Sequence, residues 1–279
     1  MAQLIDGKAI SQQIKDELKA EVEALKNDGT DICLAVIQVG DDPASSVYVR
    51  TKKRACAYIG VESRAYELPE DTTEEQLVEL VKELNADDTV NGILVQLPLP
   101  AQIDEDKIIR TISADKDVDG FHPESVGRLW IGEKGFLSCT PAGVIQLLKR
   151  SGIEIAGKEC VIIGRSNIVG KPMAALLLRE NGTVTVAHSR TKSLADVTRR
   201  ADILIVAIGK ERFITSDYVK KGAVVIDVGM HRDAENHLCG DVDFADVEPV
   251  ASAITPVPGG VGPMTIAMLM NNCVETVRS

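Results

Sequence analysis

The chain is poor in aromatic side chains, which make up 3% of its 279 residues. Proteins that bind single-stranded nucleic acid stack bases on exposed aromatic rings, so this composition argues against such a surface. A generally basic surface is also missing, because the formal net charge is −11. Nucleic acids and anionic membranes attract basic surfaces rather than acidic ones. We therefore expect neither a nucleic-acid partner nor a membrane partner.

Long apolar runs and paired cysteines are missing as well. No stretch approaches the roughly 18 apolar residues of a membrane span, and the amino terminus lacks the features of a signal peptide. The six cysteines form no Cys-x-x-Cys pair, and the four histidines show no metal-ligand spacing. Buried thiols in a reducing compartment are favoured over disulfides or zinc. These absences predict a cytoplasmic protein without a metal site.

Apolar residues account for 44% of the chain, enough for a substantial core. Short apolar runs typical of buried strands alternate with amphipathic segments typical of helices. This alternation predicts an α/β fold, with a doubly wound parallel sheet in the second half. The segment 121–139 has no strong periodicity, and we expect it to be a linker between two domains.

A glycine-containing turn follows the apolar run 160–163. Gly164 ends the run, and a helical pattern begins at Gly170. Backbone N–H groups at such a helix start lack partners within the helix, and the helix dipole attracts anions there. The turn therefore predicts a phosphate-binding site, although its spacing, Gly-x-Ser-x-x-x-Gly, differs from the usual dinucleotide fingerprint. The alternative is a turn with a purely structural role.

Hydroxyl and cationic groups occupy the place where an NAD enzyme carries an acidic residue. The next apolar run, 183–187, ends in His188, Ser189 and Arg190. An aspartate or glutamate there would hold the ribose 2′-hydroxyl of NAD, whereas a hydroxyl and a guanidinium suit a 2′-phosphate. Arg165, inside the glycine turn, offers the same chemistry. Arg165 and Arg190 therefore predict NADP as the cofactor.

Two polar residues of the first half have apolar surroundings in the sequence. Lys52 shares a predicted helix face with Tyr48 and with apolar residues, which makes it a candidate site residue. The alternative is that its side chain extends along the helix to water. Gln96 follows a buried apolar run, and ligands of α/β proteins bind at the carboxyl ends of strands. The alternative for Gln96 is a hydrogen bond to nearby backbone.

Three aspartates, Asp115, Asp117 and Asp119, precede Gly120. They do not fit a calcium loop, because the glycine and the distal glutamate are not where that loop needs them. Capping and turn roles explain most of them, and Asp119 stays a candidate site residue. Prolines and glycines in the stretch 255–265 predict a rigid loop whose backbone can approach a ligand closely.

Five segments together carry a family resemblance: 48–52, 95–100, 117–120, 164–172 and 256–265. In this order they resemble the bifunctional methylenetetrahydrofolate dehydrogenase / methenyltetrahydrofolate cyclohydrolase family over essentially the whole chain. The resemblance implies two α/β domains flanking a cleft. It implies a folate-binding catalytic domain over 1–120, completed by the C-terminal helix 263–279, and an NADP-binding Rossmann-like domain over 140–262. It also implies a homodimer.

The activity implied by the resemblance is oxidation of 5,10-methylenetetrahydrofolate with NADP, followed by hydrolysis to 10-formyltetrahydrofolate. Such one-carbon chemistry serves purine, methionine and histidine biosynthesis. The implied catalytic residues are Tyr48, Lys52, Gln96 and Asp119. The tetrahydrofolate substrate would also meet Val95, Leu97, Pro258, Gly259, Gly260, Val261 and Gly262. The cofactor would be held by Gly164, Arg165, Ser166, Ser189 and Met230.

Within this resemblance, Lys52 is the expected acid/base group of the hydrolytic step, positioned by Tyr48 and Gln96, and Asp119 would bond the pterin ring. The chain departs from the family after its last cofactor-side strand. Members usually read aspartate-valine-glycine-isoleucine-asparagine, whereas Met230 and His231 occupy the last two places here.

Two other functions compete with this interpretation. An NADP-dependent dehydrogenase of another small substrate, such as a shikimate-like compound or an amino acid, would explain residues 140–250. It would not explain Lys52 and Gln96 in the first half. A non-enzymatic NADP sensor would need no lysine on an apolar helix face.

Overall fold

The computed structural model describes the backbone of residues 2–41 and 43–278 and the side chains of the same residues except 43–47. It divides into two compact units. The six-stranded unit consists of residues 1–11 and 138–265, and the three-stranded unit of residues 12–137 and 266–279. This division differs from the predicted one, because the first residues of the chain join the larger sheet instead of the first domain.

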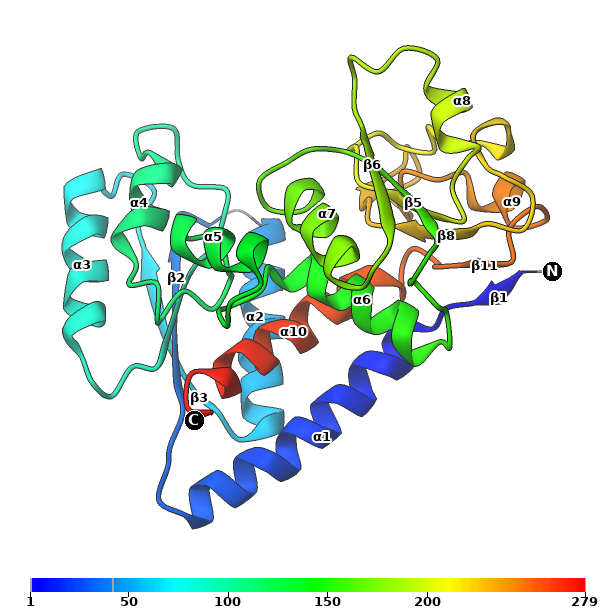
Figure 1. Cartoon of the computed structure of the whole chain (residues 1–279). Helices are drawn as coiled ribbons and strands as arrows, with labels where there is room; N and C mark the ends of the chain where they lie inside the picture. The colour runs from blue at the N-terminus through cyan, green and yellow to red at the C-terminus, as the bar shows by residue number, and fades with distance from the viewer. Residues whose placement is uncertain (1, 42, 279) are drawn as a thin grey trace. The chain divides into compact units, whose positions relative to one another are not determined.

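The three-stranded unit is built on a parallel sheet in the order β3-β2-β4. Its strands are β2 (Cys33–Val39), β3 (Glu62–Leu68) and β4 (Gly92–Val95). All residues of the central strand β2 are buried, as expected for a parallel strand that is covered on both faces. One face packs against α3 and α4, which lie together beside β2 in Figure 1.

The helices of this unit are α1 (Gly7–Asn27) from Gln12 onward, α2 (Pro43–Ile59), α3 (Glu74–Ala86), α4 (Glu105–Thr111), α5 (Pro123–Ile131) and α10 (Val261–Glu275) from Ile266 onward. Helix α5 lies in the segment 121–139, which was expected to be a linker without periodicity. It begins at Pro123, and the side chain of the N-cap residue His122 accepts a hydrogen bond from the Glu124 N–H. Its C-cap residue is Gly132, in a left-handed conformation. Local capping thus defines a helix that the apolar pattern did not reveal.

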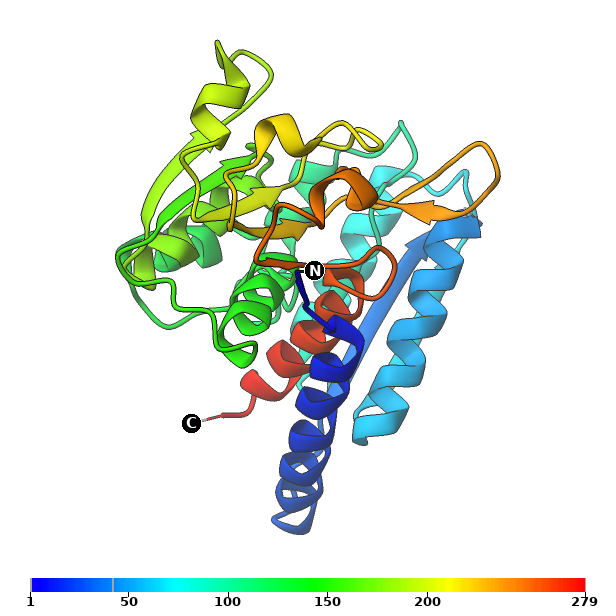
Figure 2. The ribbon, with the colours of Figure 1, turned by 90° about the vertical axis from the view of Figure 1, so that its right-hand side faces the viewer.

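The six-stranded unit contains a sheet in the order β1-β11-β8-β7-β5-β6, and every neighbouring pair in it is parallel. Its strands are β1 (Gln3–Leu4), β5 (Glu159–Ile163), β6 (Thr183–Ala187), β7 (Ile203–Val206), β8 (Val224–Asp227) and β11 (Ala253–Ile254). Strands β9 (His231–Arg232) and β10 (Leu238–Cys239) form a separate antiparallel hairpin. Figure 2 shows β6, in yellow-green, at one edge of the large sheet.

The α-helices that lie wholly within this unit are α6 (Cys139–Arg150), α7 (Gly170–Arg179), α8 (Leu194–Thr198) and α9 (Phe244–Val247). A short 3-10 helix (η1, Ser216–Tyr218) precedes β8. The parallel sheet with alternating helices confirms the predicted α/β class. All six cysteines are buried, as predicted. Within the described residues, no helix combines the length and apolar character that a membrane span requires.

Candidate active site

Lys52 is buried, although it carries a charge. It lies on α2 and is only 8% exposed, so its side chain does not extend along the helix to water. Its Nζ donates a hydrogen bond of 2.9 Å to Oε1 of Gln96. Tyr48, one turn earlier on α2, is half-buried, and burial raises the pKa of its phenol. A buried ammonium needs such polar partners to offset the loss of hydration.

Hydrogen bonds fix both the backbone and the side-chain amide of Gln96. Gln96 directly follows β4, and its backbone N–H donates to the carbonyl of Ile37 at 2.8 Å. Its side-chain Nε2 donates to the Leu97 carbonyl at 2.6 Å, which turns Oε1 toward Lys52. The backbone bond that was the alternative for Gln96 therefore coexists with the bond to Lys52. Val95 beside it is buried, and Leu97 is half-buried.

Asp119 belongs to the same group of residues. It lies in the turn after an isolated parallel bridge between Ile93 and Asp117, and Gly120 follows with a φ of 70°. Burial raises the pKa of Asp119, and the positive charge of Lys52 opposes that rise. The structure therefore brings Lys52, Gln96 and Asp119 together at the carboxyl end of β4, within the three-stranded unit.

The glycine turn of the six-stranded unit lies at a topological switch point. From β5 the chain passes to β6 on one side and then to β7 on the other side of β5. Ligands of doubly wound sheets bind at such points, outside the carboxyl ends of the strands. Ser166 Oγ accepts the backbone N–H groups of Val169 and Gly170, at 3.2 and 3.4 Å, at the start of α7.

Both glycines of this turn are required by close backbone packing. A Cβ on Gly170 would lie 2.4 Å from the carbonyl oxygen of Gly164, and a Cβ on Gly164 would lie 2.2 Å from that of Ala207. Gly164 also has a φ of 132°, which L side chains rarely adopt. The strand, turn and helix are thus held at a distance that only glycine permits.

Exposed polar groups surround the turn. Arg165 and Ser166 follow β5, and Ser189 and Arg190 follow the neighbouring strand β6; all four are exposed. Among the residues that the structure describes, no ion pair involves the guanidinium of Arg165 or of Arg190. Two cations of this kind at adjacent strand ends can meet a phosphate group.

The loop after β8 carries Met230, which is 48% exposed. Two buried carboxylates, which the sequence did not indicate as functional, hold this loop through hydrogen bonds. Asp241 accepts the N–H groups of three consecutive residues, 208–210, and contacts His231 Nε2 at 2.7 Å. Asp227 accepts the N–H groups of Gly229, Asp241 and residue 242, and burial raises its pKa to about 6. Only the position of Asp227 at the end of the apolar strand β8 could have suggested such a role.

The predicted substrate loop, 258–262, belongs to the six-stranded unit, whereas Lys52 belongs to the three-stranded unit. Its Gly259 carbonyl accepts the N–H of Lys8 at 2.9 Å, and a Cβ on Gly7 would lie 1.8 Å from the Gly260 carbonyl oxygen. Gly260 and Val261 are buried, Gly259 is half-buried, and Pro258 and Gly262 are exposed. The loop is thus fixed to the start of α1.

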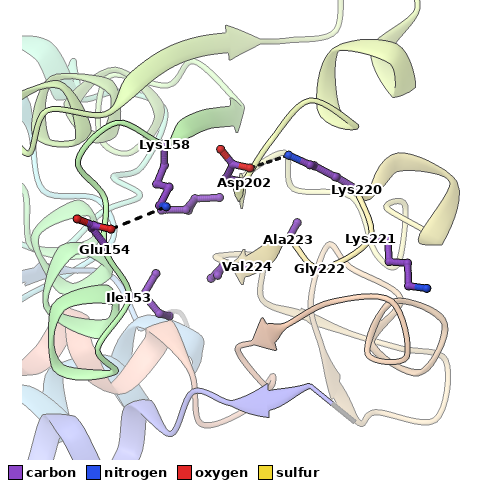
Figure 3. Close-up of a pocket in the computed structure, with 10 residues that line it drawn as sticks. Ile153, Glu154, Lys158, Asp202, Lys220, Lys221, Gly222, Ala223 and Val224 are labelled. Atoms are coloured by element: carbon purple, nitrogen blue, oxygen red, sulfur yellow. Dashed lines mark hydrogen bonds and ion pairs between the residues drawn. The ribbon is translucent and has the colours of Figure 1, made fainter.

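A cavity of about 320 Å³ lies elsewhere in the six-stranded unit (Figure 3). Ile203 and Val224, which line it, are the first residues of β7 and β8, so the cavity is at the amino ends of these strands. Lys220 bonds Asp202 at 2.7 Å on its rim. None of the predicted site residues lines this cavity, and its position at the amino ends separates it from the glycine turn.

Comparisons with known proteins match both parts of the chain. A family profile described as "Tetrahydrofolate dehydrogenase/cyclohydrolase, catalytic domain" matches residues 5–119. A second, "Tetrahydrofolate dehydrogenase/cyclohydrolase, NAD(P)-binding domain", matches residues 138–279. Because both halves match, a dehydrogenase of another small substrate is not favoured.

Individual relatives cover the whole chain. A curated "Bifunctional protein FolD" of Lachnoclostridium phytofermentans is 72% identical over 274 residues, which are 98% of this chain and 97% of the relative. The crystal structure of a bifunctional FolD methylenetetrahydrofolate dehydrogenase/cyclohydrolase from Campylobacter jejuni is 53% identical, with a TM-score of 0.97 and coverage of 99% and 98%. A Trypanosoma brucei dehydrogenase-cyclohydrolase complexed with NADP cofactor and inhibitor is 40% identical, with a TM-score of 0.93 and coverage of 99% and 97%. The chain belongs to the tetrahydrofolate dehydrogenase/cyclohydrolase family.

Proposed function

We propose that this chain oxidises 5,10-methylenetetrahydrofolate with NADP and hydrolyses the resulting 5,10-methenyltetrahydrofolate to 10-formyltetrahydrofolate. The observation that carries the proposal is the bond from the buried Lys52 ammonium to Gln96, with Asp119 close enough to sense the charge. Family membership supports both activities. The dehydrogenase and cyclohydrolase activities expected from the sequence are thus retained as the function.

In the first reaction, NADP supplies the redox chemistry by accepting a hydride from the methylene carbon. The contribution of the protein is to align the donor and acceptor carbons and to exclude water. We assign folate binding to the three-stranded unit, through Tyr48, Lys52, Gln96 and Asp119. The neighbouring Val95 and Leu97 would contact the substrate too. We also assign folate contact to the loop Pro258–Gly262, as the family resemblance implies.

In the second reaction, water adds to the methenyl carbon and the ring opens. Lys52 would first release a proton to solvent, and its amine would then accept a proton from the adding water. That proton would pass to the ring nitrogen as the bond between this nitrogen and the former methenyl carbon breaks. The proton of the remaining hydroxyl would leave to solvent as the formyl C=O forms. Gln96 Oε1, already 2.9 Å from Lys52 Nζ, would hold the amine in place throughout. Asp119 would bond the amino edge of the pterin ring, and Tyr48 would help to position Lys52.

The cofactor is NADP, in agreement with the NADP complex of the Trypanosoma brucei relative. We assign its binding to Gly164, Ser166, Ser189 and the backbone of Met230, and its 2′-phosphate to Arg165 and Arg190. The exposure of both guanidinium groups and the glycine turn at the switch point support this assignment.

We also propose a homodimer that forms through the edge of the large sheet. Strand β6 is at that edge, and Leu178 and Val186 expose 57% and 39% of their surface in the same region of the chain. An apolar sheet edge is a usual place for two chains to associate. We further propose a cytoplasmic location, which the six buried cysteines support, and a role in the one-carbon chemistry of purine, methionine and histidine biosynthesis.

Two spectrophotometric assays test the function on the purified protein. The first follows reduction of NADP by 5,10-methylenetetrahydrofolate, and the second follows loss of 5,10-methenyltetrahydrofolate. We expect both activities in the wild-type protein. Lys52→Met should abolish the second activity without weakening NADP binding, whereas Lys53→Met, at an exposed position of the same helix, should retain it. Unchanged cyclohydrolase turnover in Lys52→Met would rule out the acid/base role.

A further inference from the structure

The turn that carries Asp119 is held from two directions. On one side, Asp117 Oδ2 accepts the backbone N–H of His122 at 2.7 Å and the hydroxyl of Ser125 at 3.2 Å. These bonds join the start of the turn to the start of α5. Asp117 is 2% exposed, so they are made away from water.

On the other side, the turn is held by α10. Asn272, which is 4% exposed, donates from Nδ2 to the carbonyl of Val118 and to the carbonyl of Leu137, both at 2.8 Å. One amide group therefore joins the residue before Asp119 to the end of the segment that contains α5. All these residues belong to the three-stranded unit.

These contacts leave little freedom for Asp119. The two residues before it are buried and tied to different helices, and the residue after it is Gly120 in a left-handed conformation. An apolar side chain at position 272 could fill the same space on α10. A buried amide with its N–H groups directed at two carbonyls has a more specific effect, because it fixes backbone positions.

We propose that Asn272 and Asp117 are positioning residues that hold Asp119 beside Lys52. The proposal rests on the function proposed above, in which Asp119 binds the pterin ring. Neither residue touches the substrate. Each acts by fixing the turn 117–120, so its loss should weaken folate binding in both reactions and leave NADP binding unchanged.

The main test is Asn272→Leu, which keeps the number and branching of the side-chain heavy atoms and removes both hydrogen bonds to the carbonyls. Misplacement of a substrate-binding group by about 1 Å can cost on the order of 100-fold, so we expect the folate KM to rise at least roughly 10-fold in both reactions. The Kd for NADP should stay within about 2-fold. The control is Asn271→Leu, whose amide contacts Arg278 rather than the turn, and it should keep the wild-type folate KM.

A double-mutant cycle separates positioning from general structural support. If Asn272 acts through Asp119, adding Asn272→Leu to Asp119→Asn should raise the folate KM by no more than roughly 2- to 3-fold beyond Asp119→Asn alone. Fully multiplicative losses would overturn the positioning role, and so would an unchanged folate KM in Asn272→Leu. An Asp119→Asn enzyme with wild-type folate KM would instead overturn the proposed folate site.

Asp117→Asn provides a second variant in case Asn272→Leu does not fold. Asparagine keeps the shape and one acceptor, so we expect a smaller rise in folate KM, roughly 3- to 10-fold, again not multiplicative with Asp119→Asn. The matched control is Asp115→Asn, whose side chain is 84% exposed in the same segment. Wild-type folate KM in Asp117→Asn would overturn the assignment of Asp117.

Discussion

The buried carboxyl of Asp117 gives a quantitative prediction for stability. Its partners, the His122 N–H and the Ser125 hydroxyl, are uncharged, so no hydrogen-bonded cation offsets the loss of hydration. Burial raises the pKa of Asp117 from 3.8 to about 6. Replacing this residue by asparagine removes the charge and keeps the shape of the side chain. We therefore expect Asp117→Asn to change how stability depends on pH.

Proton binding by Asp117 determines whether stability rises or falls with pH. The folded state has the higher pKa, so it binds the proton more tightly than the unfolded state between about pH 4 and pH 6. Stability from this group is present at low pH and is lost as pH rises through about 6. A difference of about 2 pKa units corresponds to about 3 kcal/mol. Asparagine resembles the protonated form, so the variant should be more stable than the wild type by up to about 3 kcal/mol at pH 7.5.

Urea unfolding at several pH values measures this difference. Trp130 is the one tryptophan of the chain and lies on α5, so its fluorescence reports the unit that contains Asp117. The advantage of Asp117→Asn should shrink toward zero as pH falls to about 4. Asp115→Asn, at an exposed position, should show no such trend. An advantage that is absent at neutral pH, or that grows as pH falls, would refute the reasoning.

Two further predictions concern the cofactor side. Gly170→Ala would place a Cβ 2.4 Å from the Gly164 carbonyl oxygen, so the turn must shift, and we expect the Kd for NADP in a titration to rise at least roughly 10-fold. Gly127→Ala, where a Cβ meets open space, should bind NADP normally, and a normal Kd in both would contradict the steric argument. Arg190→Ala should lower the ratio of kcat/KM with NADP to that with NAD by about 10-fold or more, because one charged contact to the 2′-phosphate is lost. An unchanged ratio would show that Arg190 does not bind the phosphate.

Local signals explain which parts of the fold could be predicted. The glycine turn after β5 contains a close contact between Gly170 and Gly164, which are near one another in sequence, so its pattern indicates strand, turn and helix directly. The buried strand β2 is likewise a continuous apolar run. By contrast, β1 and β11 are two residues long and pair across most of the chain, with Gln3 opposite Ala253. No local pattern predicts such a pairing, so the sequence did not indicate that the first residues pair with the larger sheet.

The candidate site was predictable to a similar extent. Lys52 on an apolar helix face and Gln96 at a strand end indicated polar groups in buried places, and the structure joins them by a hydrogen bond. The role of Asp117 was not apparent, because an aspartate in an aspartate-glycine turn is usually an exposed cap. Its burial depends on α5 and on Ser125, which the sequence pattern did not place.

The buried carboxylates share one structural role. Asp117, Asp227 and Asp241 each accept backbone N–H groups from irregular segments, where neither helix nor sheet bonds are available. A neutral amide could accept some of these bonds at a smaller cost of burial, whereas a carboxylate accepts several at once and holds the loop more firmly. Burial raises the pKa of both Asp117 and Asp227 to about 6, so this firmness costs stability at neutral pH. The carboxylates that cause this cost contact the turn that carries Asp119 and the loop that carries Met230. Accurate placement of the two proposed ligand-binding loops is therefore a physical reason for charge in the interior of both units.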